Sequence, residues 1–243
     1  MVTRKERAFA ERERLIVETA DGMLWRAGYL GLNLDELAER VEYSKATLYN
    51  HFASKEDLVL AVVSRQMERR VDFFTRAVRY DGRTRERIFA IGLSDWLLSR
   101  LIPHGFPLVQ LVRSDSIWGK CSEGRRERMQ AINDQCFRLG MDVVDAAGAA
   151  GDLDEGRPSS GEVVWGLVSL SKGAHLLADD RIIQAGVAMG GSPMDCLIEN
   201  YHRYLDGCGW RPFWREFDYE ASRKRIEMEL FAEEFAELEA GAK

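Results

Sequence analysis

Apolar residues recur every three or four positions along most of this 243-residue chain, and that spacing leaves little choice of fold class. The first such stripe is formed by Ile16, Ala20, Met23, Leu24 and Ala27. It has the period of an amphipathic helix, which Gly28 and Gly31 then end. No segment alternates apolar and polar residues as a half-buried strand does, and no repeat is visible. The sequence therefore predicts an all-α protein.

Three helix-capping signals follow within the N-terminal quarter of the chain. They are Asn33 with Glu36, Ser44, and Ser54 with Asp57. Each places a side-chain oxygen where it can accept a free backbone N–H at a helix start. Residues 1–60 thus read as a helix, a short helix, a tight turn and a second short helix. A long helix over 54–79 then connects this domain to the rest.

The remainder of the chain is predicted to be helical as well. The candidate helices span 84–102, 107–119, 123–149, 162–178, 193–206 and 214–240, with a break at Pro103–Pro107. The expected architecture is an N-terminal three-helix domain, residues 1–60, joined by the long helix to a larger C-terminal helical bundle, residues 61–243.

Composition excludes several other classes of protein. No run of 18 apolar residues could form a transmembrane helix, and the N-terminus lacks the apolar stretch of a secretory signal. The four cysteines form no CxxC pair, and His104, Cys121 and Cys136 do not make a metal site. Phosphate-loop, GxSxG and HExxH motifs are missing. We therefore expect a cytoplasmic protein with free thiols, without cofactor or metal, that is not an enzyme and has no membrane partner.

The net charge of −6 argues weakly against nucleic acid as a partner, but charge is unevenly distributed. Residues 43–55 contain two lysines and no acid, and residues 1–14 carry five basic groups against three acidic ones. Two short helices joined by a turn, the second without carboxylates, are typical of a helix-turn-helix. The second helix can enter a major groove because no carboxylate repels the phosphates. Residues 1–60 are therefore predicted to be an N-terminal three-helix helix-turn-helix DNA-binding domain.

Individual side chains around this second helix suit separate parts of a DNA contact. Lys45, Ala46 and Thr47 suit its groove-facing N-terminal end, and Asn50 can pair with an adenine edge. Tyr49 and His51 can hold phosphates, as can Lys55 at the next helix start, whereas Phe52 is expected to be buried. The predicted DNA-binding set is Asn33, Ser44, Lys45, Ala46, Thr47, Tyr49, Asn50, His51 and Lys55. Arg4, Lys5 and Arg7 form either a DNA-binding arm or a frayed, solvated terminus.

Residues 28–60 resemble the DNA-binding domain of the tetracycline-repressor (TetR) family. The matching features are Gly28-Tyr29, Asn33, Leu37-Ala38, Ser44, Leu48-Tyr49, His51-Phe52, Ser54-Lys55 and Leu58. The resemblance implies that the C-terminal domain binds a small ligand and forms a homodimer. Glu42 departs from the pattern, since the family commonly has glycine there. Either the turn is built differently, or a positive φ is accepted at a cost of about 1 kcal/mol.

Bulky and polar residues of the C-terminal bundle are candidates for the ligand site. The aromatic candidates are Phe89, Trp96, Trp118, Phe137 and Trp165, although aromatics at helical spacing are more often plain core. Ser169, Lys172 and His175 interrupt the otherwise apolar segment 162–178. They indicate either a ligand contact or the dimer interface, because buried polar groups need partners.

These features predict a sequence-specific transcriptional regulator, most simply a repressor. It would bind a near-palindromic double-stranded operator as a homodimer, with its affinity modulated by an unidentified small-molecule ligand. Two alternatives remain open at this point. The helix-turn-helix could be the scaffold of an interaction protein, or the bundle could be a small-molecule-binding or catalytic protein.

Overall fold

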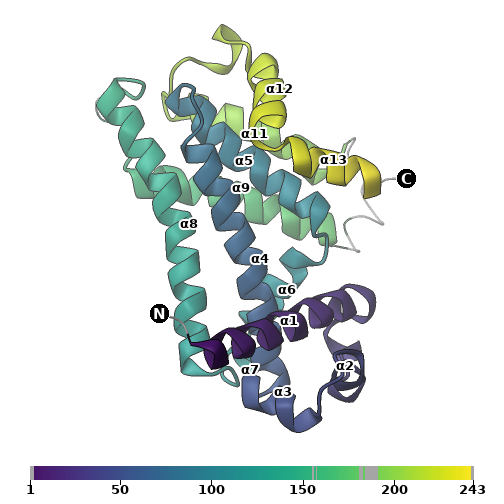
Figure 1. Cartoon of the computed structure of the whole chain (residues 1–243). Helices are drawn as coiled ribbons and strands as arrows, with labels where there is room; N and C mark the ends of the chain where they lie inside the picture. Colours follow the sequence, from purple (N-terminus) through teal and green to yellow (C-terminus); the bar gives the residue numbers. More distant parts are fainter. Residues whose placement is uncertain (1–2, 155, 157, 181–182, 184–190, 242–243) are drawn as a thin grey trace. The chain divides into compact units, whose positions relative to one another are not determined.

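A computed structural model describes residues 3–154, 156, 158–180, 183 and 191–241 (Figure 1). Its helices are α1 (Arg4–Gly31), α2 (Leu34–Arg40), α3 (Lys45–His51), α4 (Lys55–Val78), α5 (Thr84–Leu101), α6 (Gly105–Val112), α7 (Asp115–Trp118), α8 (Glu123–Ala150), α9 (Ser160–Asp179), α11 (Pro193–Gly207), the 3₁₀ turn η1 (Trp214–Glu216), α12 (Tyr219–Leu230) and α13 (Ala232–Gly241). The described residues contain no strand, only an isolated bridge between Leu153 and Trp210. The all-α prediction is confirmed.

The contacts of the chain divide it into two compact units. The first combines Met1–Glu68 with His104–Asn133, and the second combines Arg69–Pro103 with Asp134–Lys243. The first unit is therefore larger than the predicted DNA-binding domain of residues 1–60. Helices α4 and α8 each contribute residues to both units.

Helix α1 begins twelve residues before its predicted apolar stripe, at Arg4. Thr3 caps it, because its side chain accepts the Glu6 N–H while the Glu6 carboxylate accepts the Thr3 N–H. Arg4 and its basic neighbours therefore lie on an exposed helical turn, so this terminus is solvated as expected but is not frayed, and its contact with DNA stays a prediction. Gly28 interrupts the helix with a φ of 66°, as its predicted role as a stop requires.

The core of the first unit is built from the inner faces of its helices. Ile16 and Ala20 of α1, Leu37 of α2, Leu48 of α3 and Leu58 of α4 are all almost inaccessible to solvent. Burying such side chains contributes about 1.5–3 kcal/mol for each large aliphatic residue. This packing fixes which face of each short helix is left for solvent.

The turn between α2 and α3 is the tight turn for which the sequence left two possibilities open, a different construction or a positive φ at Glu42. Glu42 has a φ of 58°, and it is the one non-glycine residue with positive φ in the described ranges. The Tyr43 N–H donates to the Ala38 carbonyl at 3.0 Å and the Glu42 N–H to that of Glu39 at 3.2 Å. This bonding ends α2 in a left-handed cap of the kind that glycine usually supplies. The conformational cost of Glu42 is therefore accepted.

Two predicted helices are each divided in the structure. The segment 107–119 forms α6 and α7, because the N–H groups of Arg113 and Ser114 turn back to the carbonyls of Gln110 and Leu111. Pro107 is tolerated in the first turn of α6, where no intrahelical donor is needed. The segment 214–240 forms η1, α12 and α13.

Phe231 causes the break between α12 and α13. Its side chain is fully buried, with its ring centroid 5.2 Å from that of Phe73, and its φ and ψ of −131° and 23° are not helical. The backbone thus leaves the helix at the residue whose ring packs into the core of the second unit.

The second unit surrounds a larger apolar core. It includes Phe89, Leu93 and Leu97 of α5, Val144 of α8, and Trp210 after α11. Helices α9 and α11 pack against each other. No described helix carries an apolar stretch long enough to cross a bilayer.

Candidate nucleic-acid interface

Helix α3 is held by its ends and its inner face, which leaves one face in solvent. The Ser44 side chain accepts the Thr47 N–H at 3.1 Å, as the predicted cap requires. Leu48 and Phe52 are 3% exposed and anchor the helix in the core, as predicted for Phe52. Since the anchors lie on one side, the other side is free for a partner. The exposed residues there are Lys45, Ala46, Tyr49 and Asn50, with Thr47 half-exposed.

The exposed face of α3 carries cationic and neutral polar groups and no carboxylate of its own. Lys45 Nζ lies 2.8 Å from an oxygen of Asp35 on α2. The hydrogen bond to Asp35 raises the pKa of Lys45 above its ordinary value, so this ammonium group stays charged. Both side chains are well exposed, and such a surface pair contributes about 1 kcal/mol or less. A phosphate or a base edge could therefore displace Asp35 at small cost.

Asn33 caps α2 as predicted, but the capping arrangement is one-sided. Its side-chain oxygen accepts the N–H groups of Asp35, at 2.8 Å, and Glu36, at 3.4 Å. The second hydrogen bond of a capping box, in which the Glu36 carboxylate would accept the Asn33 N–H, is not formed. Glu36 pairs instead with Arg40 at 2.7 Å. Asn33 is exposed and helps to set the turn of chain that precedes α2.

Lys55 is the first residue of α4, so it lies at a helix start, as predicted for a residue that contacts a phosphate there. Its Nζ sits 4.6 Å from the centre of the Tyr29 ring, in a cation–π contact. Burial lowers the pKa of Lys55, with Glu56 acting in the opposite direction. The Tyr29 hydroxyl donates to Glu56 at 3.0 Å, and Lys120 also pairs with Glu56 at 2.8 Å. Lys55 is thus a half-buried cation at a helix N-terminus.

His51 differs from the rest of the predicted set. Its side chain is only 2% exposed, and its ring stacks on Phe9 of α1 with centroids 3.9 Å apart. Its Nδ1 lies 3.5 Å from a carboxylate oxygen of Glu13. The ring therefore faces α1 and is not presented to a phosphate. We omit His51 from the proposed DNA-contacting set and assign it to packing.

The candidate ligand residues are not gathered around one site. Trp118 belongs to the first unit, whereas the others belong to the second. Phe89 is buried with its ring centroid 4.8 Å from that of His202, and Trp96 is half-buried with its ring near Phe235. Trp165 is 60% exposed and lies over Phe137, with their centroids 5.2 Å apart. The exposed Ser169 donates to the Trp165 carbonyl.

A buried polar cluster in the second unit was missed by the sequence reasoning, apart from His175. Asp95 accepts hydrogen bonds from Arg70 and Ser171, and its Oδ2 lies 3.8 Å from His175 Nε2. Burial opposes the charge of Asp95, but Arg70 and His175 outweigh it and hold its pKa below the usual range. Tyr201 is buried beside them, and burial raises its pKa. Two features of the sequence could have indicated this cluster. Asp95 is an acid within the apolar run 88–98, and Ser171 lies four residues before His175, on the same face of one helix.

Comparison with known proteins places the N-terminal helices in a family. A family model described as bacterial regulatory proteins, tetR family, matches residues 16–62, which cover most of α1, all of α2 and α3, and the start of α4. Over these residues the chain is similar to the DNA-binding segment of the TetR family. The matched segment contains Glu42, so this chain carries a glutamate in the left-handed turn position of that segment.

A curated relative and several solved structures extend the likeness. The HTH-type transcriptional activator FasR of Mycolicibacterium smegmatis is 35% identical over 80 residues, 33% of this chain and 36% of the relative's length. The fold is similar to that of a TetR/AcrR-family transcriptional regulator from Thermobifida fusca, with a TM-score of 0.62 at 19% identity over 81% of this chain and 98% of that one. A candidate transcriptional regulator from Saccharomonospora viridis, in complex with choline, gives a TM-score of 0.57 at 19% identity over 81% and 96% of the two chains.

Proposed function

We propose that this chain is a transcriptional regulator that binds a near-palindromic DNA operator as a homodimer and represses by occupying it. The observation that carries the proposal is the exposed, carboxylate-free face of α3. It is capped by Ser44, anchored by Leu48 and Phe52, and lined by Lys45, Tyr49 and Asn50. Phosphate contacts would supply affinity, and Lys45, Thr47 and Asn50 would read base edges.

The outer face of α9 supports the homodimer. Trp165, Ser169 and Leu176 follow one another at helical spacing on this face, and all three are exposed. The side chains of Trp165 and Leu176 are 60% and 54% exposed, which is unusual for a tryptophan and a leucine on one helix face. Two large apolar side chains exposed on one helix face are typical of an interface, and we propose a second copy of α9 as the partner that covers them.

The proposed ligand site lies in the second unit. Arg70, Asp95, Ser171 and Tyr201 form a buried polar cluster there, and a small molecule with polar groups could exchange hydrogen bonds with it. The choline complex of the Saccharomonospora viridis protein supports a ligand-binding role for this fold. A ligand would alter operator affinity only through a difference in its affinity for two states of the dimer. A DNA-bound regulator of this kind would work in the cytoplasm.

The first test is selection of bound sequences from a random duplex library, followed by titration at several salt concentrations. Each Lys55 in the complex, as a phosphate contact, should contribute about 0.9 to the steepness of log affinity against log salt. Lys55→Ala should reduce the slope by that amount per copy, and Tyr49→Ala should weaken binding. Lys224→Ala removes the same charge from an exposed position on α12 in the other unit, so it should change neither quantity.

An interaction protein that uses the helix-turn-helix only as scaffold would give a different result. It would select no duplex sequence and would show no salt-steep binding at low ionic strength, which would refute the proposal. A reporter gene controlled by the selected duplex then tests the direction of regulation. Repression lowers its expression, whereas an activator, as FasR is named, would raise it.

A further inference from the structure

One arginine of α8 contacts α1, α4 and the C-terminal end of α3. Arg125 lies in the first turn of α8 and is only 18% exposed. Its Nη2 donates to the His51 carbonyl at 3.0 Å and to Glu13 of α1 at 3.1 Å, while its Nε donates to Asp57 of α4 at 3.1 Å. Its guanidinium also lies over the Phe52 ring, 4.7 Å from the centroid.

The contact with the His51 carbonyl is the central one. His51 is the last residue of α3, and the final carbonyls of a helix have no intrahelical donor. Arg125 supplies a charged donor to one of them, which is stronger than a neutral one. Because the peptide of His51 and the ring of Phe52 are both in contact with the same guanidinium, Arg125 fixes where α3 ends.

Asp57 holds Arg125 and the start of α8 in place. This carboxylate is almost fully buried, and it accepts the N–H and the hydroxyl of Ser122 at 2.9 and 2.8 Å as well as the Arg125 Nε–H. It also accepts the Ala53 N–H at 3.1 Å, just after α3. A positive charge in the first turn of a helix is unfavourable, because the N-terminal end of the helix dipole is also positive. The bonds of Arg125 to Asp57, Glu13 and the His51 carbonyl offset this cost.

Further bonds tie the same stretch of chain to the junction between α3 and α4. The Ser54 hydroxyl donates to the Lys120 carbonyl at 3.1 Å, and Lys120 Nζ pairs with Glu56. The junction is therefore bonded to residues 120–125, about 65 positions later in the chain.

We propose that Arg125 is a positioning residue that sets the orientation of α3 for DNA, and that α8 passes regulatory changes to α3 through it. The inference rests on the proposed DNA-binding function. Helix α8 runs unbroken to Ala150, and its residues from Asp134 onward belong to the second unit. Because Arg125 lies at the start of α8 and donates to the His51 carbonyl, a change that moves the start of α8 also moves this donor.

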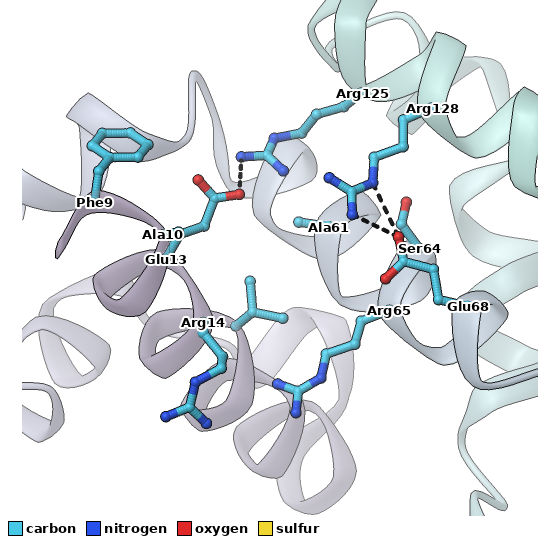
Figure 2. A pocket seen from close by; sticks show the side chains of 11 residues that line it. Phe9, Ala10, Glu13, Arg14, Ala61, Ser64, Arg65, Glu68, Arg125 and Arg128 are labelled. Atoms are coloured by element: carbon cyan, nitrogen blue, oxygen red, sulfur yellow. Dashed lines mark hydrogen bonds and ion pairs between the residues drawn. The ribbon is translucent and has the colours of Figure 1, made fainter. Parts of the chain in front are cut away.

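A matched control lies one turn further along α8. Figure 2 shows Arg125 directed toward Glu13 and Arg128 directed toward Glu68, both at the edge of a pocket of about 320 Å³. Arg128 pairs with Glu68 at 2.6 Å, and both of these side chains are well exposed. Arg128→Gln thus removes the same charge from the same helix without touching α3.

The test compares Arg125→Gln, Arg125→Lys and Arg128→Gln with the wild-type chain in two measurements. The first is hydrogen exchange of the amides in residues 45–53, which needs no DNA. The second is the affinity for selected duplex as a function of salt. Arg125→Gln should accelerate the exchange and weaken duplex binding about tenfold while leaving the salt slope unchanged, because Arg125 does not contact phosphate. Arg125→Lys should restore part of both, and Arg128→Gln should match wild type.

Each result bears on a separate claim. Unchanged exchange and affinity in Arg125→Gln would overturn the positioning role, and so would a slope reduced as in Lys55→Ala, which would make Arg125 a phosphate contact. A wild-type chain that binds no duplex would refute the proposed function, while the exchange measurement would still decide whether Arg125 orders α3. Should Arg125→Gln fail to fold by circular dichroism, the same readouts on Arg125→Lys decide the question.

Discussion

Glu42 adopts a backbone conformation that side chains with a Cβ avoid. Its φ of 58° costs about 1–2 kcal/mol relative to a right-handed conformation, while glycine adopts it freely. Glycine also loses more conformational freedom on folding, which offsets part of the gain. We predict that Glu42→Gly raises the free energy of unfolding by about 0.5–1 kcal/mol, measured by urea denaturation.

The control for this prediction lies in the preceding helix. Glu39 is exposed on α2 and has helical geometry, so Glu39→Gly should lower the free energy of unfolding by about 0.5–1 kcal/mol. Equal effects of the two substitutions would contradict the argument, because they would show that the left-handed conformation of Glu42 is not costly.

His202 gives the second unit a pH-dependent stability. Its ring is buried between those of Phe89, Trp214 and Tyr219. Burial, helped by Arg85, lowers its pKa to about 4 from a usual value of 6.5. The unfolded chain therefore binds a proton that the folded chain does not between these values. The contribution is present above pH 6.5 and is lost as the pH falls toward 4, by on the order of 3 kcal/mol.

The substitution His202→Phe tests this dependence. Phenylalanine keeps an aromatic ring in the stack and cannot be protonated, and the buried His202 Nδ1 has no hydrogen-bond partner to lose. We predict that the unfolding free energy of the variant falls less than that of wild type between pH 6.5 and 4. Since all other titrating groups are shared, the difference between the two curves isolates His202. Parallel curves would rule out this histidine as the source.

The sequence was informative for residues whose partners are close along the chain. The caps at Asn33, Ser44 and Ser54 were predictable because each bonds to an N–H two or three positions away. The burial of His51 was not predictable, because its partners Phe9 and Glu13 lie about 40 positions earlier. A basic ring in an acid-free segment fits a phosphate contact equally well until α1 is in place.

The same distinction holds for whole helices. Local apolar spacing located α5, α8, α9 and α11 to within two residues of their ends. It did not locate the break at Phe231, because that break is caused by burial against Phe73, more than 150 positions away. Nor did it show that the segment 104–133 joins the helix-turn-helix, which depends on contacts such as those of Asp57 with Ser122 and Arg125.

The outer face of α9 carries a prediction about association. Trp165 is exposed on this face, and burying it against a second copy would contribute on the order of 2 kcal/mol per side chain. We predict that Trp165→Asp changes a dimer into a monomer in sedimentation velocity, with no loss of helical content by circular dichroism. Glu162→Asp, a conservative change at the exposed capping residue of the same helix, should leave the dimer intact.

In the assembled molecule, two copies of α3 should read two half-sites at once. Linking two binding modules raises affinity by about 10²–10⁴-fold when both can engage, without any new contact in either one. Wild-type protein should therefore bind a full operator that much more tightly than a duplex with one half-site destroyed. The Trp165→Asp variant has one α3 per particle, so it should bind the two duplexes equally, near the half-site affinity of wild type. A variant that is monomeric and still prefers the full operator would contradict the dimeric mode of binding, because one recognition helix cannot occupy both half-sites.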